Sequence, residues 1–369
     1  MKKAVMGAAL ALLVSASLSA RELGQGAVME PLPEIGERVY QMFHFPDDRL
    51  PVIDGDLTDW EIVGDAYAQD TYQLIEFNRD IGRGYDLRDL DIRVRTGYHS
   101  GHNRIYVAVE YFDGFHNFDR VVTPGSGDLG NDDIFEIVVD TDRSGNDFIY
   151  DLDRRLMSTH AQNYHIYVHE RHGEHVWVWG DQRWLGDAPW SQWASRYDGN
   201  HGSSGLSTLE FYVPPFDYAH PDGPRRSAPG TLAVGDTIGF DYSILDRDDE
   251  EEKVVKFWAL CDTIMMYRDA DFLPAFVLAQ PEPGLAALPV VEFRSQAPTQ
   301  QAPHTVRFTN FTRGEIAHFH WDFGDGDTST ERDPVHQYRQ PGRYTVTLEA
   351  EGSQGTSRRR KMDYVVLER

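Results

Sequence analysis

The chain has 369 residues, of which 40% are hydrophobic and 12% are aromatic. This length and composition indicate a globular protein of two ordinary domains and exclude wholesale disorder. Acidic residues outnumber basic ones by 60 to 35, which gives a formal charge of −25. That balance excludes a nucleic-acid partner, because binding to phosphates needs a basic surface. It favours a soluble protein that repels its neighbours or gathers divalent cations.

The first twenty residues have the pattern of a secretory signal peptide. Two lysines precede an apolar run over residues 4–14, and small residues up to Ala20 follow. The run is shorter than the ~20 residues needed to span a bilayer, so the pattern predicts export and cleavage. We therefore expect a signal peptide at 1–20, an extended leader at 21–45, and a secreted, periplasmic or cell-surface protein without a membrane span.

Short runs of alternating apolar residues recur along the chain and are separated by clusters of Gly, Asp, Asn and Pro. Examples are RIYVAVEYF (104–112) and YTVTLEAE (344–351). Alternation with a period of two is typical of antiparallel sheets in sandwiches and barrels. The pattern predicts an all-β protein made of two β-sandwich domains.

A proline-rich segment, AQPEPGLAALP (279–289), separates two strand-rich blocks. Such a shift in composition indicates a joint between domains. We expect a large domain at 46–279, a linker at 280–288 and a small domain at 289–369.

The small domain contains the stretch HWDFGDGDTSTERDPVHQY (320–338). Trp321 and Phe323 alternate with Asp322, so both rings face one core. Gly324-Asp325-Gly326 then makes a tight turn, because glycine accepts a positive φ and aspartate bonds back to the backbone.

The string WDFGDG, followed by H-x-Y and P-G-x-Y-x-V, resembles the signature of the PKD domain, a small Ig-like β-sandwich. In that family these residues are structural. The resemblance therefore implies that Asp322 and Asp325 brace the turn, and that His336 and Tyr338 pack and form hydrogen bonds without catalysing a reaction. It also raises the prospect of a protein partner for this domain.

The large domain contains six short motifs in a set order: VIDGDLTDW (52–60), NRIYVAVEYFDG (103–114), NDDIFEIVVDTDRSGND (131–147), LSTLEFYVPP (206–215), VGDTIGFDYSILDRDD (234–249) and FLPAFVLA (272–279). Together they resemble carbohydrate-binding module family 9 and its DOMON-like relatives, which are antiparallel β-sandwiches. The resemblance implies a carbohydrate ligand, or a glycan at the cell surface.

The loop DTDRSGNDFIYD (140–151) places oxygen-bearing side chains at alternate positions of a tight turn. This spacing resembles an EF-hand loop and lets several oxygens converge on one hard cation. It predicts structural calcium, which members of the resembled family often carry, with a polar hairpin turn as the alternative. The predicted ligands are Asp140, Asp142, Ser144, Asp147 and Asp151.

Five of the eight tryptophans lie between residues 177 and 193. Indole rings stack on the flat C–H faces of sugars, so all five are candidate carbohydrate-binding residues: Trp177, Trp179, Trp184, Trp190 and Trp193. A hairpin about His172-Gly173 would set Val168 opposite Trp177 and Ile166 opposite Trp179. This register favours core packing for Trp177 and Trp179 and leaves the other three, in a Gly- and Pro-containing loop, as the stacking platforms.

The chain has no nucleophile elbow, no H-E-x-x-H and no phosphate loop, and these absences favour a binding protein over an enzyme. A glycosidase-type carboxylate pair among the 60 acids stays open. The leading hypothesis is an exported, non-catalytic carbohydrate-binding protein. One alternative is a haem-binding electron-transfer domain with ligands from Met265, Met266 and the histidine-rich hairpin. The other is a cell-surface adhesion or scaffold protein.

Overall fold

The computed structural model describes residues 39–76, 86–118, 132–149, 153–171, 174–248, 256–283, 285, 288–295, 300–301 and 303–368. These residues belong to a compact unit that spans residues 34–369. The expected signal peptide and most of the expected leader lie outside the described residues. Among the described residues, no helix is long and apolar enough to cross a membrane.

The structure is built from strands and one-turn helices, which confirms the all-β prediction. The strands of the large domain are β1 (Val39–His44), β2 (Ala68–Asp70), β3 (Ile75–Glu76), β4 (Leu90–His99), β5 (Arg104–Asp113), β6 (Ile134–Asp140), β7 (Gln162–Arg171), β8 (Glu174–Val178), β9 (Gln192–Arg196), β10 (Gly205–Val213), β11 (Phe216–Tyr218), β12 (Ala228–Pro229), β13 (Thr237–Asp246), β14 (Lys256–Ala259) and β15 (Ala275–Leu278). The short 3-10 helices are η1 (Leu57–Ile62), η2 (Asp65–Tyr67), η3 (Thr71–Gln73), η4 (Arg183–Gly186), η5 (Pro224–Arg226), η6 (Ile264–Tyr267) and η7 (Ala270–Phe272).

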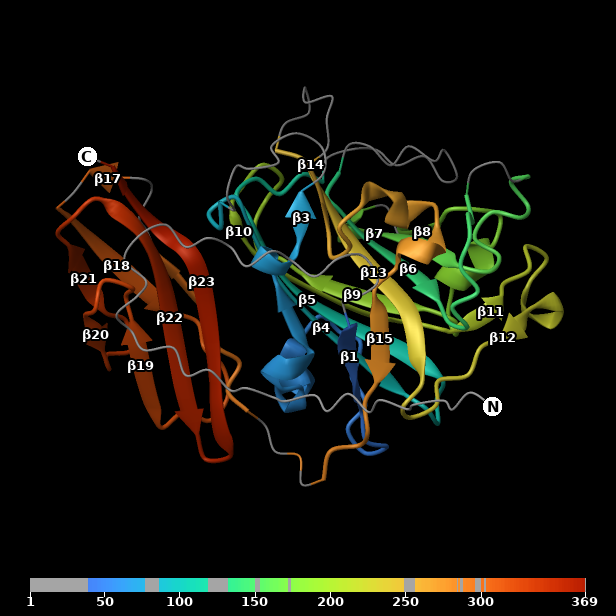
Figure 1. Ribbon diagram of the computed structural model, residues 1–369, viewed down its shortest axis with the longest axis horizontal. Helices are drawn as coiled ribbons and strands as arrows, with labels where there is room; N and C mark the ends of the chain where they lie inside the picture. The colour runs from blue at the N-terminus through green and yellow to red at the C-terminus, as the bar shows by residue number, and fades with distance from the viewer. Residues whose placement is uncertain are drawn as a thin grey trace, which may run out of the picture. The chain divides into compact units, whose positions relative to one another are not determined.

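The large domain is a sandwich whose two layers share one strand. Along the hydrogen-bonded path the order is β8-β7-β6-β13-β15-β1-β4-β5-β10-β9 (Figure 1). Strand β1 pairs with β15 through Val39–Met42 and with β4 through Phe43–His44, so it passes from one layer to the other. Residues 39–44, which the sequence analysis assigns to the leader, therefore form a strand within the sheet path.

The main core fills the space between the two layers. Alternating residues of β4 and β5 contribute from one layer, and those of β6 and β13 from the other. Ile92, Val94, Ile137 and Phe240 are completely buried there. Because side chains alternate across a strand, the same strands also direct residues to the outer faces of the layers. Acids and histidines are among these outward-facing residues.

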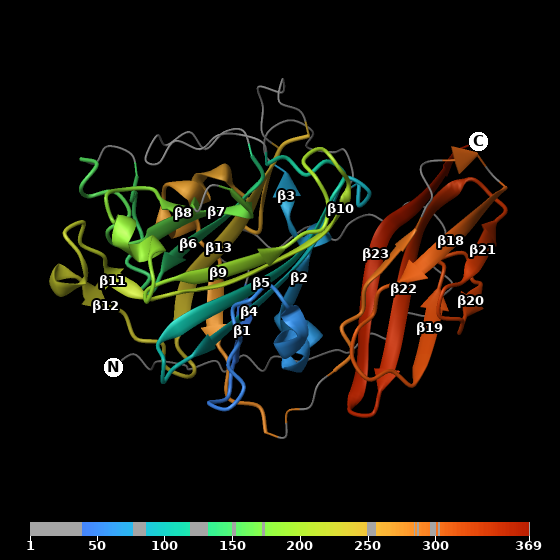
Figure 2. The same ribbon diagram turned by 180° about the vertical axis from the view of Figure 1, so that it is seen from behind.

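The small domain has its own two sheets and its own core, seen as the orange and red strands of Figure 2. Its strands are β16 (Phe293–Ser295), β17 (Gln300–Gln301), β18 (His304–Asn310), β19 (His318–Asp322), β20 (Thr328–Ser329), β21 (Val335–Tyr338), β22 (Gly342–Gly352) and β23 (Gly355–Glu368). The sheet orders are β16-β18-β21 and β17-β23-β22-β19-β20.

The WDFGDG turn is a structural corner of this small sandwich. Trp321 and Phe323 lie in its core. The Asp322 carboxylate accepts a hydrogen bond from the Gly324 N–H at 2.9 Å, and Asp325 Oδ2 lies 2.7 Å from His336 Nε2. The Tyr338 hydroxyl donates to the Phe323 carbonyl at 3.0 Å. These contacts give the aspartates, His336 and Tyr338 the bracing roles that the PKD resemblance implies.

Candidate functional site

The tryptophans of the β7–β8 hairpin do not have the register expected from the sequence. His165 pairs with Trp177 and Ile166 pairs with Val176, and the register shifts between Ile166 and Arg171. A shift of one residue sends side chains to the opposite face of a sheet. The expected pairs Val168–Trp177 and Ile166–Trp179 are therefore wrong.

Trp179 accordingly lies away from the main core. It is half-buried and stacks on Tyr267 with ring centroids 6.1 Å apart. The same face of the hairpin carries His165, whose ring lies 5.7 Å from that of Trp179. Trp179 and His165 thus meet on the outer face of this hairpin.

Trp184, Trp190 and Trp193 are half-buried and pack against the main core. The Trp184 ring meets Trp190 edge-on at 5.3 Å, and its indole N–H donates to the His220 carbonyl at 3.0 Å. Trp193 lies in β9, opposite Phe211 of β10. Trp190 also lines a pocket.

The pocket beside Trp190 has a volume of about 270 Å³, close to the lower end of the roughly 300–1,000 Å³ range of small-molecule sites. Its wall is mainly prolines and aromatic rings, together with three polar residues. The lining residues are His102, Asn103, Arg104, Pro189, Trp190, Pro214, Pro215, Phe216 and Pro229.

Two of the polar residues are held in place by neighbours. The Asn103 side chain donates to the Gly230 carbonyl at 2.8 Å and accepts from the Leu232 N–H at 3.0 Å. The Arg104 guanidinium lies over the Tyr212 ring at 3.9 Å and donates to the Pro189 carbonyl at 3.4 Å. Arginine has five N–H donors, so Arg104 is fixed in position and keeps donors for a ligand.

The predicted calcium loop closes on itself as a tight turn. Asp140 accepts hydrogen bonds from the N–H groups of Ser144 (3.2 Å) and Gly145 (2.9 Å), and Asp142 also accepts from Ser144 (3.0 Å). Burial, with the neighbouring Asp142 carboxylate, raises the pKa of Asp140 to about 6.

The other predicted ligands of that loop take different positions. Asp147 pairs with Arg268 at 3.2 Å, and Asp151 lies outside the described residues. The structure thus brings together Asp140, Asp142 and the backbone of Ser144. Calcium at this turn stays a prediction.

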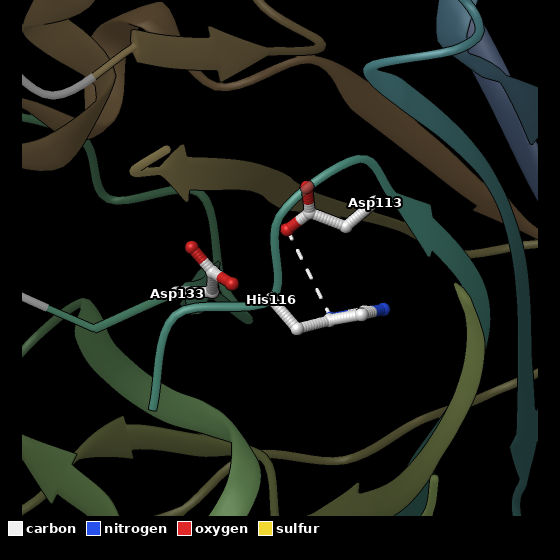
Figure 3. A group of neighbouring side chains, drawn as sticks. All are labelled: Asp113, His116 and Asp133. Carbon is white, nitrogen blue, oxygen red and sulfur yellow. Dashed lines mark ion pairs between the residues drawn. The ribbon is translucent and has the colours of Figure 1, made fainter. Parts of the chain in front are cut away.

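A second acidic cluster lies where β5 ends and β6 begins. Asp113, His116 and Asp133 are all buried, and ligand atoms of the three lie within 4.8 Å of one another (Figure 3). Burial raises the pKa of Asp113 to about 6, and burial with repulsion from Asp113 and Asp246 raises the pKa of Asp133 well above its ordinary range.

His116 is a neutral histidine whose two ring nitrogens are both engaged. Its Nε2 lies 2.9 Å from the Gly205 carbonyl and must donate, so Nδ1 accepts the proton of His169 Nε2 at 2.9 Å. Burial lowers the pKa of His116 to about 4 and that of His169 to about 3. The 3.9 Å approach of His116 to Asp113, dashed in Figure 3, is therefore not a charged pair at neutral pH.

The cluster continues through Asp246 at the end of β13. Asp246 is 1% exposed, and its carboxylate lies with those of Asp89 and Asp248 around the Lys256 ammonium group. Lys256 donates to Asp89 at 2.8 Å and also bonds Asp248, but lies 3.6 Å from Asp246 Oδ2. Burial and repulsion from Asp113 raise the pKa of Asp246 well above its ordinary range.

The sequence analysis did not select these acids or the polar wall of the pocket as site residues. A signal for the acids is present, because Asp113, Asp133 and Asp246 each stand at the end of a predicted strand. Their convergence follows from the pairing of β6 with β13, which sets Ile134 opposite Leu245. Arg104 and His102 carry no such signal.

Two of the ligands that the haem alternative offers, Met266 and His169, have other partners. Met266 is completely buried in the cluster that contains Phe148 and Cys261. His169 is bonded to His116, as described above.

The family model that matches the protein covers its small domain. Residues 286–367 match the family model of the PKD domain. Part of the chain is 50% identical over 42 residues to a microbial collagenase of Vibrio alginolyticus, covering 11% of this chain and 5% of that protein. It is also 26% identical over 117 residues to the pre-pro-metalloprotease PrtV of Vibrio cholerae, covering 32% and 12%. The chain thus spans a small part of these relatives.

Solved structures similar to the protein are of two kinds. A carbohydrate-binding module of family 9 from Caldicellulosiruptor kristjanssonii, in complex with cellotriose, is 13% identical with a TM-score of 0.41, covering 68% of this chain and 97% of that one. The PKD1 domain of Vibrio cholerae PrtV is 28% identical with a TM-score of 0.20, covering 22% and 99%. The family resemblances named from sequence motifs therefore recur among the structural neighbours.

Proposed function

We propose that this protein is an exported carbohydrate-binding protein that holds a saccharide, without cleaving it, in the pocket beside Trp190. The observation that carries the proposal is the pairing of an apolar wall with fixed polar groups. Trp190 and Phe216 offer aromatic surface for the C–H face of a sugar ring, while Arg104 offers donors for hydroxyl oxygens. Small-molecule sites typically combine such a wall with a few placed polar groups.

The chemistry of the pocket supports binding without hydrolysis. Glycosidases use two carboxyl groups on either side of the scissile bond. The lining residues of this pocket include neither aspartate nor glutamate.

The test compares two half-buried tryptophans on different faces of the sandwich. A glycan array screened with residues 21–369 identifies a ligand, and calorimetry then measures its Kd for the wild type, Trp190→Ala and the control Trp179→Ala. Loss of the stacking ring in Trp190→Ala should weaken binding at least about ten-fold, or 1.4 kcal/mol, and the control should retain wild-type affinity.

Near-ultraviolet circular dichroism establishes that both variants are folded. A loss of affinity in Trp179→Ala alone would place the ligand on the outer face of the β7–β8 hairpin and contradict the proposed pocket. The absence of any bound glycan would contradict the proposed function itself.

A further inference from the structure

We propose that the pocket beside Trp190 takes an acidic saccharide, in which the carboxylate of a uronic acid residue binds to the Arg104 guanidinium. This inference rests on the proposed function, because it names the class of sugar for the same pocket. Trp190 and Phe216 would hold the sugar ring, and Arg104 would select the charged substituent. The proposal therefore distinguishes uronic acids from neutral hexoses of the same ring configuration.

The first observation is that Arg104 has no acidic partner. It is half-buried at the start of β5, donates to the Pro189 carbonyl at 3.4 Å and lies over the Tyr212 ring at 3.9 Å. Both of these groups are neutral, whereas the guanidinium is always charged. Among the described residues, no carboxylate lies within ion-pair distance of Arg104.

Other arginines of the large domain are paired with acids. On the neighbouring strand β4, Arg95 pairs with Glu110 at 3.1 Å and Arg93 pairs with Asp65 at 2.5 Å. The chain has 60 acidic residues against 35 basic ones, so acids for such pairs are abundant. A partly buried charge without a partner is costly. Arg104 departs from the pattern of its neighbours, and an anionic ligand would supply the missing partner.

One acid next to the pocket, Asp217, is directed away from it. Asp217 follows Phe216 in β11, and successive side chains of a strand point to opposite faces. A Cβ built on Gly230 would lie 2.5 Å from Asp217 Oδ1 and 2.6 Å from Thr141 Cγ2. Asp217 therefore lies beside Thr141, at the turn that begins with Asp140.

A second acid, Asp47, is paired with a histidine behind the β4–β5 turn. The Asp47 carboxylate lies 2.8 Å from His99 Nε2. His99 Nδ1 accepts from the backbone N–H of His102 at 2.9 Å, so Nε2 carries the proton and donates to Asp47. His102 itself lines the pocket, with its ring 4.8 Å from that of His99. Neither Asp47 nor Asp217 therefore compensates Arg104.

The chemistry of the guanidinium favours a carboxylate over a hydroxyl group. Its planar N–H groups match the two oxygens of a carboxylate, and hydrogen bonds between ions are roughly twice as strong as neutral ones. The formal charge of −25 repels anions at long range. However, exposed charges more than about 8 Å apart are largely screened at physiological ionic strength. Direct contact with Arg104 therefore decides the preference of the pocket.

The test compares each uronic acid with the neutral sugar of the same configuration. Calorimetry on the full chain measures Kd for trisaccharides of galacturonate, glucuronate and mannuronate, and for those of galactose, glucose and mannose. At least one uronate should bind at least about ten-fold tighter than its neutral counterpart, because the added ion pair contributes a charged hydrogen bond. A trisaccharide of galactose sulfate is the further probe, because sulfate is another anion that a guanidinium binds.

Arg104→Gln should weaken binding of that uronate at least about ten-fold and leave the affinity for the neutral counterpart unchanged. Arg104→Lys should keep part of the preference, because an ammonium group retains the charge without the planar pair of donors. The matched control is Arg88→Gln, which removes the same charge at the other end of β4, where Arg88 pairs with Asp86 at 2.6 Å. It should keep wild-type affinity. Near-ultraviolet circular dichroism checks the fold, and Arg104→Lys carries the test if Arg104→Gln does not fold.

The outcomes separate this inference from the proposed function. Equal affinity for uronate and neutral trisaccharides, with loss of both in Trp190→Ala, would overturn the inference and leave the proposed function standing. A uronate preference that survives in Arg104→Gln would also overturn it, by assigning the anion to another cation. Tighter binding of the sulfated probe than of any uronate would reject the carboxylate. Absence of binding to every saccharide would contradict the proposed function itself, and the inference with it.

Discussion

At the scale of single residues, Gly324 can occupy its place in the turn because it has no Cβ atom. Its φ is +80°, and a Cβ built there would lie 2.4 Å from the Thr345 carbonyl oxygen. Gly326 has a similar φ of +97° but open space around it. Gly324 therefore meets a backbone clash in addition to the strain of a positive φ.

Substitution of Gly324 by alanine should lower the free energy of unfolding by more than the same change at Gly326. The strain of a positive φ costs about 1–3 kcal/mol, and the clash with Thr345 adds to it at Gly324 alone. Chemical denaturation of both variants measures the difference. Equal losses would show that the close approach to Thr345 is relieved at no cost.

At the scale of elements, a buried acid on β4 is surrounded by cations of β16 and β23. Asp91 is 2% exposed and accepts from Arg294 (2.6 Å), Arg359 (2.9 Å) and Lys361 (2.5 Å). Lys361 also donates to Glu292 at 2.7 Å. Burial lowers the pKa of Lys361 and lowers that of Arg359 to about 9, because removal from water disfavours the charged form of both groups.

Asp91→Ala should lower the free energy of unfolding by about 3–5 kcal/mol, because it leaves buried cations without their common partner. The control is Asp181→Ala, which breaks the exposed pair with Arg154 and should cost only about 0–1 kcal/mol. Urea denaturation compares the two. Similar losses in both variants would contradict the importance assigned to the buried network.

At the scale of the whole molecule, the buried acids make stability depend on pH. The pKa of Asp113 is about 6 in the folded chain against an ordinary 3.8. Between these values Asp113 binds more protons in the folded state than in the unfolded state, so its contribution to stability falls as pH rises. Asp133 and Asp246, whose pKa values are also raised, extend the effect to higher pH.

His116 and His169, whose pKa values are lowered, contribute with the opposite sign in the same range, so the prediction concerns the difference between two proteins. In EDTA, the Tm of Asp113→Asn relative to that of the wild type should rise as pH increases from about 4 to 6. The shift of Asp113 corresponds to about 2 to 3 kcal/mol. Calorimetric scans of both proteins between pH 4 and 8 measure the difference in Tm. This difference separates the contribution of Asp113 to the pH dependence from those of Glu210 and Asp140, whose pKa values are also raised. Parallel curves for the two proteins would contradict the assignment.

The fold class and the role of the small domain's turn can both be predicted from local sequence. Alternation with a period of two is a local property, so runs such as residues 104–112 specify strands wherever they pair. The WDFGDG turn is equally local, because Gly324 and Asp322 interact within three residues of each other. No long-range contact is needed to predict either.

The faces on which the tryptophans lie, and the approach of acids from different strands, depend instead on contacts between segments far apart in the chain. A register shift in the β7–β8 hairpin moves Trp179 to the outer face, and hydrophobic alternation does not reveal such a shift. The convergence of Asp113, Asp133 and Asp246 depends on which strands become neighbours, and Arg104 reaches the Trp190 pocket by the same kind of long-range placement. Pairing partners far apart in sequence are selected by the packing of the whole sandwich, which no single segment encodes.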